Sequence, residues 1–182
     1  MSLSSIAAKR PGAPAFHSIT LVVAVLAGLV TAGTVAVMLS ASAMFLGWVA
    51  YGINSKTTAE GYANLICYVL GVGFGLVTTI VINWLTPSIG LTATGLAIFA
   101  VVVLVMCLRA GTPFNNPLAY FLGITSFFYS GLAPSFGAFA TLTAAGAVGA
   151  TGAAVSSCCQ AGLLRRHSST MATTLRRRQS AA

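Results

Sequence analysis

The side chains that could do chemistry in this 182-residue chain are few and widely spaced. One acidic residue, Glu60, is present, and the two histidines, His17 and His167, lie near opposite ends of the chain. Acid–base or nucleophilic catalysis needs titratable groups placed in pairs, and neither histidine has such a partner in the sequence. The four cysteines show no CxxC spacing, and no HExxH, P-loop or dinucleotide fingerprint occurs. We therefore expect no enzymatic activity, no metal and no cofactor.

Glu60 lies in the segment Thr57-Thr58-Ala59-Glu60-Gly61, at the expected start of a long helix. A carboxylate in the first helical turn is favourable at the positive end of the helix dipole, and a threonine before it can cap the same turn. A structural role is therefore preferred over proton coupling, which would require a buried Glu60. A relay built of several carboxylates is excluded because the chain has no other.

The composition places these residues in a membrane protein. Hydrophobic residues make up 57% of the chain and charged residues 5%, whereas a soluble domain carries about 25% charged residues. Seven of the nine basic residues lie in the first ten or the last eighteen positions. Two basic tails suit anionic lipid headgroups and do not form a groove for a nucleic-acid backbone. We expect lipid partners and no nucleic-acid partner.

Apolar runs predict six membrane helices. A helix rises 1.5 Å per residue, so crossing about 30 Å of hydrocarbon takes about 20 residues. Four runs are long enough, and two, of 13 and 16 residues, fall between a buried segment and a spanning one. The six runs are 19–39, 41–53, 62–85, 89–108, 118–133 and 136–159.

The basic residues test whether the two short runs cross. If they do not cross, Lys56 and Arg109 lie on the side opposite to the basic N-terminus; if both cross, all nine basic residues share one side. The positive-inside rule therefore favours six spans with both termini cytoplasmic, in a membrane that the sequence does not identify. Signal-peptide cleavage after Ala41-Ser42-Ala43 is the competing interpretation, but the first run has 21 residues against about 7 to 15 for a signal-peptide core.

An internal repeat appears when the chain is shifted by 76 residues against itself. Phe45-Leu46-Gly47 then aligns with Phe121-Leu122-Gly123, and Gly73 aligns with Gly149. Three spans in each half make the second half inverted relative to the first. The predicted fold is an all-α six-span helical bundle of two inverted three-helix repeats, each with one short Phe-Leu-Gly helix.

These patterns divide the chain into three parts. A cytoplasmic N-terminal tail covers 1–17, and an integral membrane domain covers 18–163, with repeat 1 at about 18–86 and repeat 2 at about 87–163. A basic tail, 164–182, has too little apolar surface to fold and is predicted to be disordered.

Short helices interrupted by glycine, in equivalent positions of two inverted halves, often form a solute site. The alternative is that these glycines, and the small-residue stripe of Ala145, Gly149 and Ala153, serve only close packing. Amides, hydroxyls and aromatic rings would suit a small neutral or weakly polar solute. The candidate pathway residues are Phe45, Gly47, Trp48, Tyr51, Asn64, Asn83, Phe121, Gly123, Thr125 and Phe127.

The C-terminal region also carries candidate modification sites. Ser168 and Ser180 each follow an arginine pair by two residues, a pattern that suits basic-directed kinases, and a phosphate there would offset the lipid-attracting charge. Cys158 and Cys159 lie near the predicted membrane edge, where palmitoylation is common. Such patterns also arise by chance in an arginine- and serine-rich tail.

The segments 44–51 and 119–128 carry a resemblance to a known family. With the runs around them, they resemble the YcdZ-like family of small bacterial inner-membrane proteins, a domain-of-unknown-function family, over about residues 20–160. The resemblance implies a membrane fold and no defined activity.

Two functions remain open from the sequence. The first is a channel or facilitator for a small solute, formed by a homo-oligomer. The alternative is a non-transporting membrane scaffold or assembly factor that acts through its basic tail.

Overall fold

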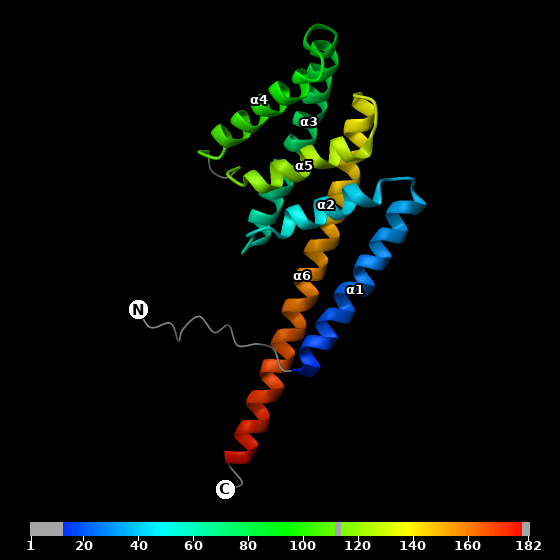
Figure 1. Cartoon of the computed structure of the whole chain (residues 1–182). Helices are drawn as coiled ribbons and strands as arrows, with labels where there is room; N and C mark the ends of the chain where they lie inside the picture. Colours follow the sequence, from blue (N-terminus) through cyan, green and yellow to red (C-terminus); the bar gives the residue numbers. More distant parts are fainter. Residues whose placement is uncertain (1–12, 112–113, 180–182) are drawn as a thin grey trace. The chain divides into compact units, whose positions relative to one another are not determined.

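The computed structural model describes residues 13–111 and 114–179, and this part of the chain is helical with short connections and no strand. Each predicted apolar run corresponds to one helix, which confirms the all-α prediction. The helices are α1 (Ala13–Ala36), α2 (Ala41–Gly52), α3 (Thr58–Ile89), α4 (Thr92–Leu108), α5 (Pro117–Ser130) and α6 (Phe136–Gln179), as Figure 1 shows.

The chain divides into two compact units. One is Leu29–Ala154, here called the central unit, and the other combines Met1–Gly28 with Val155–Ala182. The central unit contains all of α2 to α5, the end of α1 and the beginning of α6. Every predicted pathway residue therefore lies in the central unit.

Three helical segments are long and apolar enough to cross a membrane: His17–Ala36, Thr58–Ile89 and Phe136–Arg165. The remaining helices are shorter. Helix α4 has 17 residues, and the 12 residues of α2 and 14 of α5 rise only about 18 Å and about 21 Å. Length alone therefore accounts for three crossings.

Large apolar side chains are exposed on the outer faces of α3 and α4. Trp84 on α3 is 77% exposed, and Phe99 on α4 is 66% exposed. A soluble protein rarely exposes so much contiguous apolar surface, whereas a bilayer solvates it. The exposed faces agree with a membrane association.

Local sequence explains where α2 and α3 begin. The Ala43 N–H donates to Ser40 Oγ at 3.3 Å, which caps α2. At α3, the Glu60 N–H donates to Thr57 Oγ1 at 3.2 Å, and the Thr57 N–H donates to Glu60 Oε2 at 3.3 Å. These reciprocal bonds form a capping box. Glu60 is exposed, which confirms its predicted structural role.

The ends of α3 and α6 differ from the prediction, and the end of α3 is the smaller difference. The runs 62–85 and 89–108 predict a turn at 86–88, but α3 continues through Pro87 to Ile89 and is capped by Gly90, whose φ of 61° suits glycine. A proline in the last turn removes one backbone donor, which leaves the rest of the turn intact.

The segment predicted as a disordered tail from residue 164 has helical backbone in the described residues, since α6 extends to Gln179. Extending an existing helix requires no new nucleus, and the five arginines, two leucines and one alanine of residues 164–179 favour helix.

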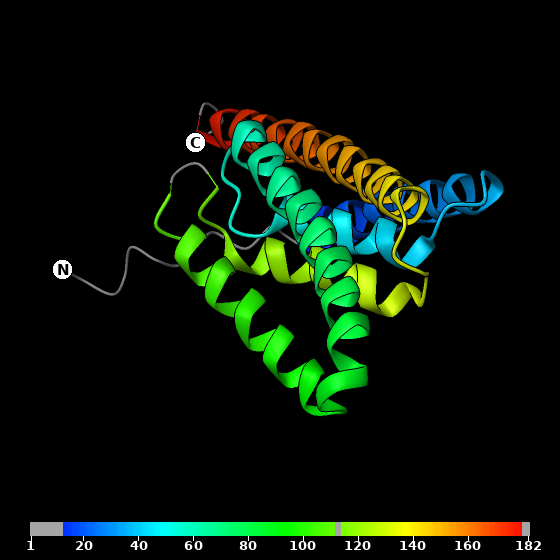
Figure 2. The same ribbon diagram turned by 90° about the horizontal axis from the view of Figure 1, so that it is seen from above.

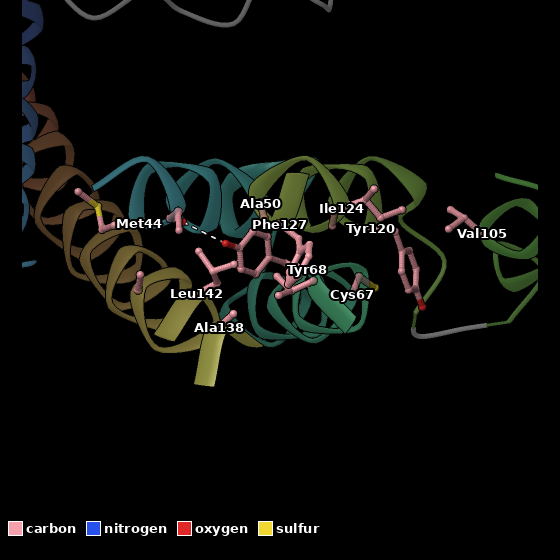
Figure 3. Packing of buried hydrophobic residues seen from close by; sticks show 14 of the residues in the cluster. Met44, Ala50, Cys67, Tyr68, Val105, Tyr120, Ile124, Phe127, Ala138 and Leu142 are labelled. Carbon is pink, nitrogen blue, oxygen red and sulfur yellow. Dashed lines mark hydrogen bonds between the residues drawn. The ribbon is translucent and has the colours of Figure 1, made fainter. Parts of the chain in front are cut away.

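Helices α2 to α6 all contribute buried side chains to the core of the central unit. Helix α2 packs beside α5 and runs in the opposite direction, and α3 packs against both (Figures 1 and 2). Figure 3 shows the Tyr68 ring of α3 between side chains of α2, α5 and α6. Met44, Tyr68, Phe127 and Leu142 are each no more than 2% exposed. The space between the two short helices is therefore filled with side chains.

Glycines set two close helix crossings. Where α2 crosses α6, a Cβ on Gly47 would overlap the Gly146 carbonyl, and a Cβ on Gly149 would overlap the Met44 carbonyl. Where α5 crosses α3, a Cβ on Gly123 would overlap the Tyr68 carbonyl, and one on Gly71 would overlap the Tyr120 carbonyl. Each short helix thus lies directly on the backbone of a long one.

Candidate functional site

A polar cavity of about 810 Å³ opens at one end of the central unit. It lies where the end of α2, the start of α3, the loop after α4 and the start of α5 meet. Amide, cationic and apolar side chains line it together. The amide-bearing residues in its wall are Asn54, Asn64, Asn115 and Asn116.

Two of these amides form a partly buried hydrogen-bonded cluster with the end of α2. Asn64 Nδ2 donates to the Ile53 carbonyl at 2.7 Å, and Asn116 Nδ2 donates to Asn64 Oδ1 at 3.0 Å and to the same carbonyl at 3.3 Å. Asn64 is 7% exposed. A buried amide needs such partners to offset its desolvation. The cluster ties α2, α3 and α5 together at the cavity wall.

The local sequence explains this arrangement. Asn116 is the N-cap residue of α5 and is followed by Pro117, which suits the first helical position. Its side chain makes no capping bond to α5 and turns instead toward Asn64. Asn54, which has a φ of 54°, reverses the chain after α2 and brings the Ile53 carbonyl toward α3.

The cavity also carries the two basic residues that lie between the tails. Lys56 and Arg109 both line it, although they belong to different loops. The sequence prediction required these residues to lie at the same end of the bundle, and the shared cavity agrees with that requirement. Glu60 lines the same cavity, and its Oε2 accepts the Lys56 N–H at 2.6 Å.

A second buried polar contact joins the two short helices deeper in the core. The Tyr68 hydroxyl donates to the Ala43 carbonyl at 3.2 Å and lies 2.9 Å from Ser126 Oγ. A Cβ on Gly146 would overlap the Tyr68 ring, so α6 packs directly against this side chain. The Tyr68 hydroxyl thus links α2 to α5.

The predicted pathway residues fall into three groups. Asn64 lines the cavity, whereas Phe45, Asn83 and Thr125 are exposed on helix faces outside it. The others lie buried or half-buried in helix contacts. These packing residues are Gly47, Trp48, Tyr51, Phe121, Gly123 and Phe127.

A smaller cavity, of about 180 Å³, lies between α3 and α4 and has an apolar lining that includes Phe74, Val77 and Leu104. It contains no charged side chain in its wall. Its chemistry suits hydrocarbon, and it does not continue the polar cavity.

Sequence reasoning missed the roles of Asn116 and Tyr68. Asn116 lies in the pair Asn115-Asn116 directly before Pro117, and two amides beside a helix-starting proline were the available signal. Tyr68 lies in the middle of an apolar run, where a hydroxyl needs a partner. The identity of that partner depends on long-range packing.

The candidate modification sites lie in α6 or beyond it. Cys158 and Cys159 are exposed free thiols. Ser168 belongs to the helical backbone of α6, and Ser180 lies outside the described residues.

A family model described as "Protein of unknown function (DUF1097)" matches residues 20–159. No curated protein and no solved structure matches the chain. The match agrees with the resemblance to a family of unknown function, and the narrower YcdZ-like assignment stays a prediction. Because the matched range covers most of the chain and includes all of the central unit from residue 29 onward, this protein belongs to the DUF1097 family of proteins of unknown function.

Proposed function

We propose that this protein is a multi-pass membrane channel or facilitator for a small neutral or weakly polar solute. The observation that carries the proposal is the polar cavity with the hydrogen-bonded Asn64 and Asn116 in its wall. Amides are costly to place at membrane depth, so they are often associated with a polar lumen. The cavity would be the entrance to the solute pathway.

The proposal includes six spans with both termini cytoplasmic. Lys56 and Arg109 share one cavity, which supports an outward and a return crossing by α3 and α4 between their loops. The crossings by α2 and α5 rest on the positive-inside rule, which gathers all nine basic residues on one side. Helices α2 and α5 are shorter than the usual hydrocarbon thickness. Burial among longer helices and local thinning of the bilayer would accommodate them.

The proposal also includes two inverted halves. The reciprocal glycine contacts support it: Met44 and Tyr120 are equivalent in the two short helices, and the carbonyl of each lies on a long-helix glycine. The residue of the first half that is equivalent to Gly149 by this contact is Gly71, whereas the constant shift of 76 residues predicts Gly73. A Cβ on Gly73 would only reach Phe139 at 3.6 Å, an ordinary contact. A two-residue offset between the long helices would explain the difference.

The two close crossings describe a closed state of the proposed pathway. Met44, Tyr68 and Phe127 fill the space between the short helices, and the Tyr68 hydroxyl joins α2 to α5. Solute passage would require α2 and α5 to separate at this contact. Inverted halves provide such a movement when one half rocks against the other.

Solute flux into liposomes tests the proposal. The full chain is reconstituted, and osmotic swelling is followed with glycerol, urea and acetamide as separate probes. We expect swelling above that of protein-free liposomes for at least one probe. Asn64→Leu is expected to reduce it at least several-fold, whereas Asn83→Leu, which changes an exposed amide on the same helix, is expected to preserve it.

A packed core favours the second candidate function, a membrane scaffold or assembly factor. The side chains between α2 and α5 leave no polar gap in the described core. If all three solutes give protein-free rates while truncation after Arg165 abolishes recruitment of a partner, the scaffold replaces the channel. A homo-oligomer is compatible with both functions.

A further inference from the structure

Two cationic side chains line the polar cavity without a neutralising partner. Glu60 is the only acidic residue of the chain. Its Oε2 accepts the backbone N–H groups of Lys56 and Thr57, at 2.6 and 3.3 Å. Among the described residues, neither Lys56 nor Arg109 has an ion-pair partner. The cavity therefore holds two exposed cations against one carboxylate, which is already engaged as a helix cap.

Other features of the wall add to this positive character. Helix α5 begins at the cavity without a side-chain cap, so the positive end of its dipole faces the same space. Asn115 adds an exposed amide. Arginine, lysine and amide donors at the end of a helix form a common environment for oxyanions.

The rest of the wall is apolar and open to the surface. Ala59, Ala63, Pro117 and Leu118 line the cavity beside the cations, and Leu118 is 54% exposed. A free anion gains little from such a surface, whereas a phosphate attached to acyl chains could place its head on the cations and its chains along the helices. Basic cavities between membrane helices bind phospholipid headgroups in this way.

We propose that this cavity binds a phosphate group, with Lys56 and Arg109 as its cationic contacts. The phosphate would come from a phospholipid headgroup or from free inorganic phosphate. The proposal goes beyond solute transport because it depends on the cations and not on the Asn64–Asn116 pair. Phosphate binding is measured in an experiment that involves no solute flux. A failure of the phosphate-site proposal is therefore distinguished from a failure of the channel proposal.

Lipid retention tests the proposal. The full chain is extracted from vesicles of phosphatidylcholine mixed with phosphatidylglycerol, and bound phosphatidylglycerol is measured by native mass spectrometry. We expect Lys56→Gln and Arg109→Gln each to lower the apparent affinity about fivefold, and the double variant about twentyfold, as expected for a cation near a lipid surface. Lys56→Arg should retain binding, which separates loss of charge from loss of fold.

Arg165→Gln is the matched control because it removes an exposed cation that does not line the cavity, and it leaves the remaining tail charge in place. Titration with inorganic phosphate, followed by thermal unfolding, distinguishes the two sources. Stabilisation by phosphate that is lost in the double variant identifies a free-anion site, whereas retention of phosphatidylglycerol without this response identifies a headgroup site. Equal binding by the parent and the double variant, or an equal loss in Arg165→Gln, would overturn the proposal.

Discussion

Asn64 and Asn116 are joined by a 3.0 Å hydrogen bond, although 52 positions separate them in the chain. Both amides also donate to the carbonyl of Ile53. One backbone oxygen at the end of α2 therefore connects the start of α3 with the start of α5. This three-helix junction forms one side of the polar cavity, so its integrity determines the cavity's shape.

Breaking this junction should cost stability. Asn116→Ala removes two donated hydrogen bonds and leaves Asn64 Oδ1 without its partner. Side-chain hydrogen bonds in membrane proteins contribute about 0.6 to 2 kcal/mol, so we expect a loss of about 1 kcal/mol in the free energy of unfolding. Reversible unfolding of Asn64→Ala, Asn116→Ala and the double variant in detergent gives the coupling energy. Strictly additive effects would show that the two amides do not act together.

The glycine crossings should tolerate no side chain. Gly123→Ala places a methyl group on the Tyr68 carbonyl, and the resulting displacement should cost about 1 to 3 kcal/mol of unfolding free energy. Gly95→Ala is the control because nothing lies within 4 Å of its added Cβ, and alanine favours helix there by about 1 kcal/mol. Thermal unfolding checks both. A Gly123→Ala protein as stable as the parent would contradict the close approach of α5 and α3.

The Tyr68 hydroxyl should stabilise the contact between α2 and α5. Tyr68→Phe leaves the Ala43 carbonyl without this donor and Ser126 Oγ without its neighbour, and we expect a loss of about 1 kcal/mol. The control is Tyr62→Phe, in which the changed ring is 43% exposed and lies 5.5 Å from Tyr51 between centroids. Similar melting temperatures for the two variants would contradict a stabilising contact of the Tyr68 hydroxyl with α2 and α5.

The capping box predicts that Glu60 acts on folding and not on transport. Glu60→Ala removes the acceptor of the Lys56 and Thr57 N–H groups, and loss of such a cap costs about 1 kcal/mol. Thermal unfolding should register this cost, whereas the solute flux per folded protein should be unchanged. A flux that disappears in Glu60→Gln despite normal unfolding would assign the carboxylate a transport role.

The helices could be predicted from the sequence because each corresponds to one continuous apolar run, whose recognition needs no knowledge of distant contacts. Even the two short runs, 41–53 and 118–133, correspond to α2 and α5. The turn moved from 86–88 to Gly90 because a helix can continue past Pro87 in its last turn. The helical backbone after residue 164 was missed because low apolar content argues against an independent fold but does not stop an existing helix.

The candidate site was predicted only in part. Asn64 was recognised as an unusual amide in an apolar run, and the charge pattern placed Lys56 and Arg109 together. Two features depend on how the packed helices rotate about their axes, which the sequence does not reveal. One is the hydrogen bond between Asn64 and Asn116. The other is the contact of Gly71, rather than Gly73, with α5 at the helix crossing. A two-residue change in register leaves the apolar pattern nearly intact, so composition does not fix it.

Sidedness of the two inner loops tests the central claim most directly. In a variant with all four native cysteines replaced by serine, single cysteines are introduced as Lys56→Cys, Arg109→Cys and Arg176→Cys. Oriented vesicles are then treated with a membrane-impermeant thiol reagent. Six spans with cytoplasmic termini predict that all three cysteines react from the cytoplasmic side. Labelling of position 56 or 109 from the side opposite to position 176 would contradict the six-span architecture and the pathway proposed within it.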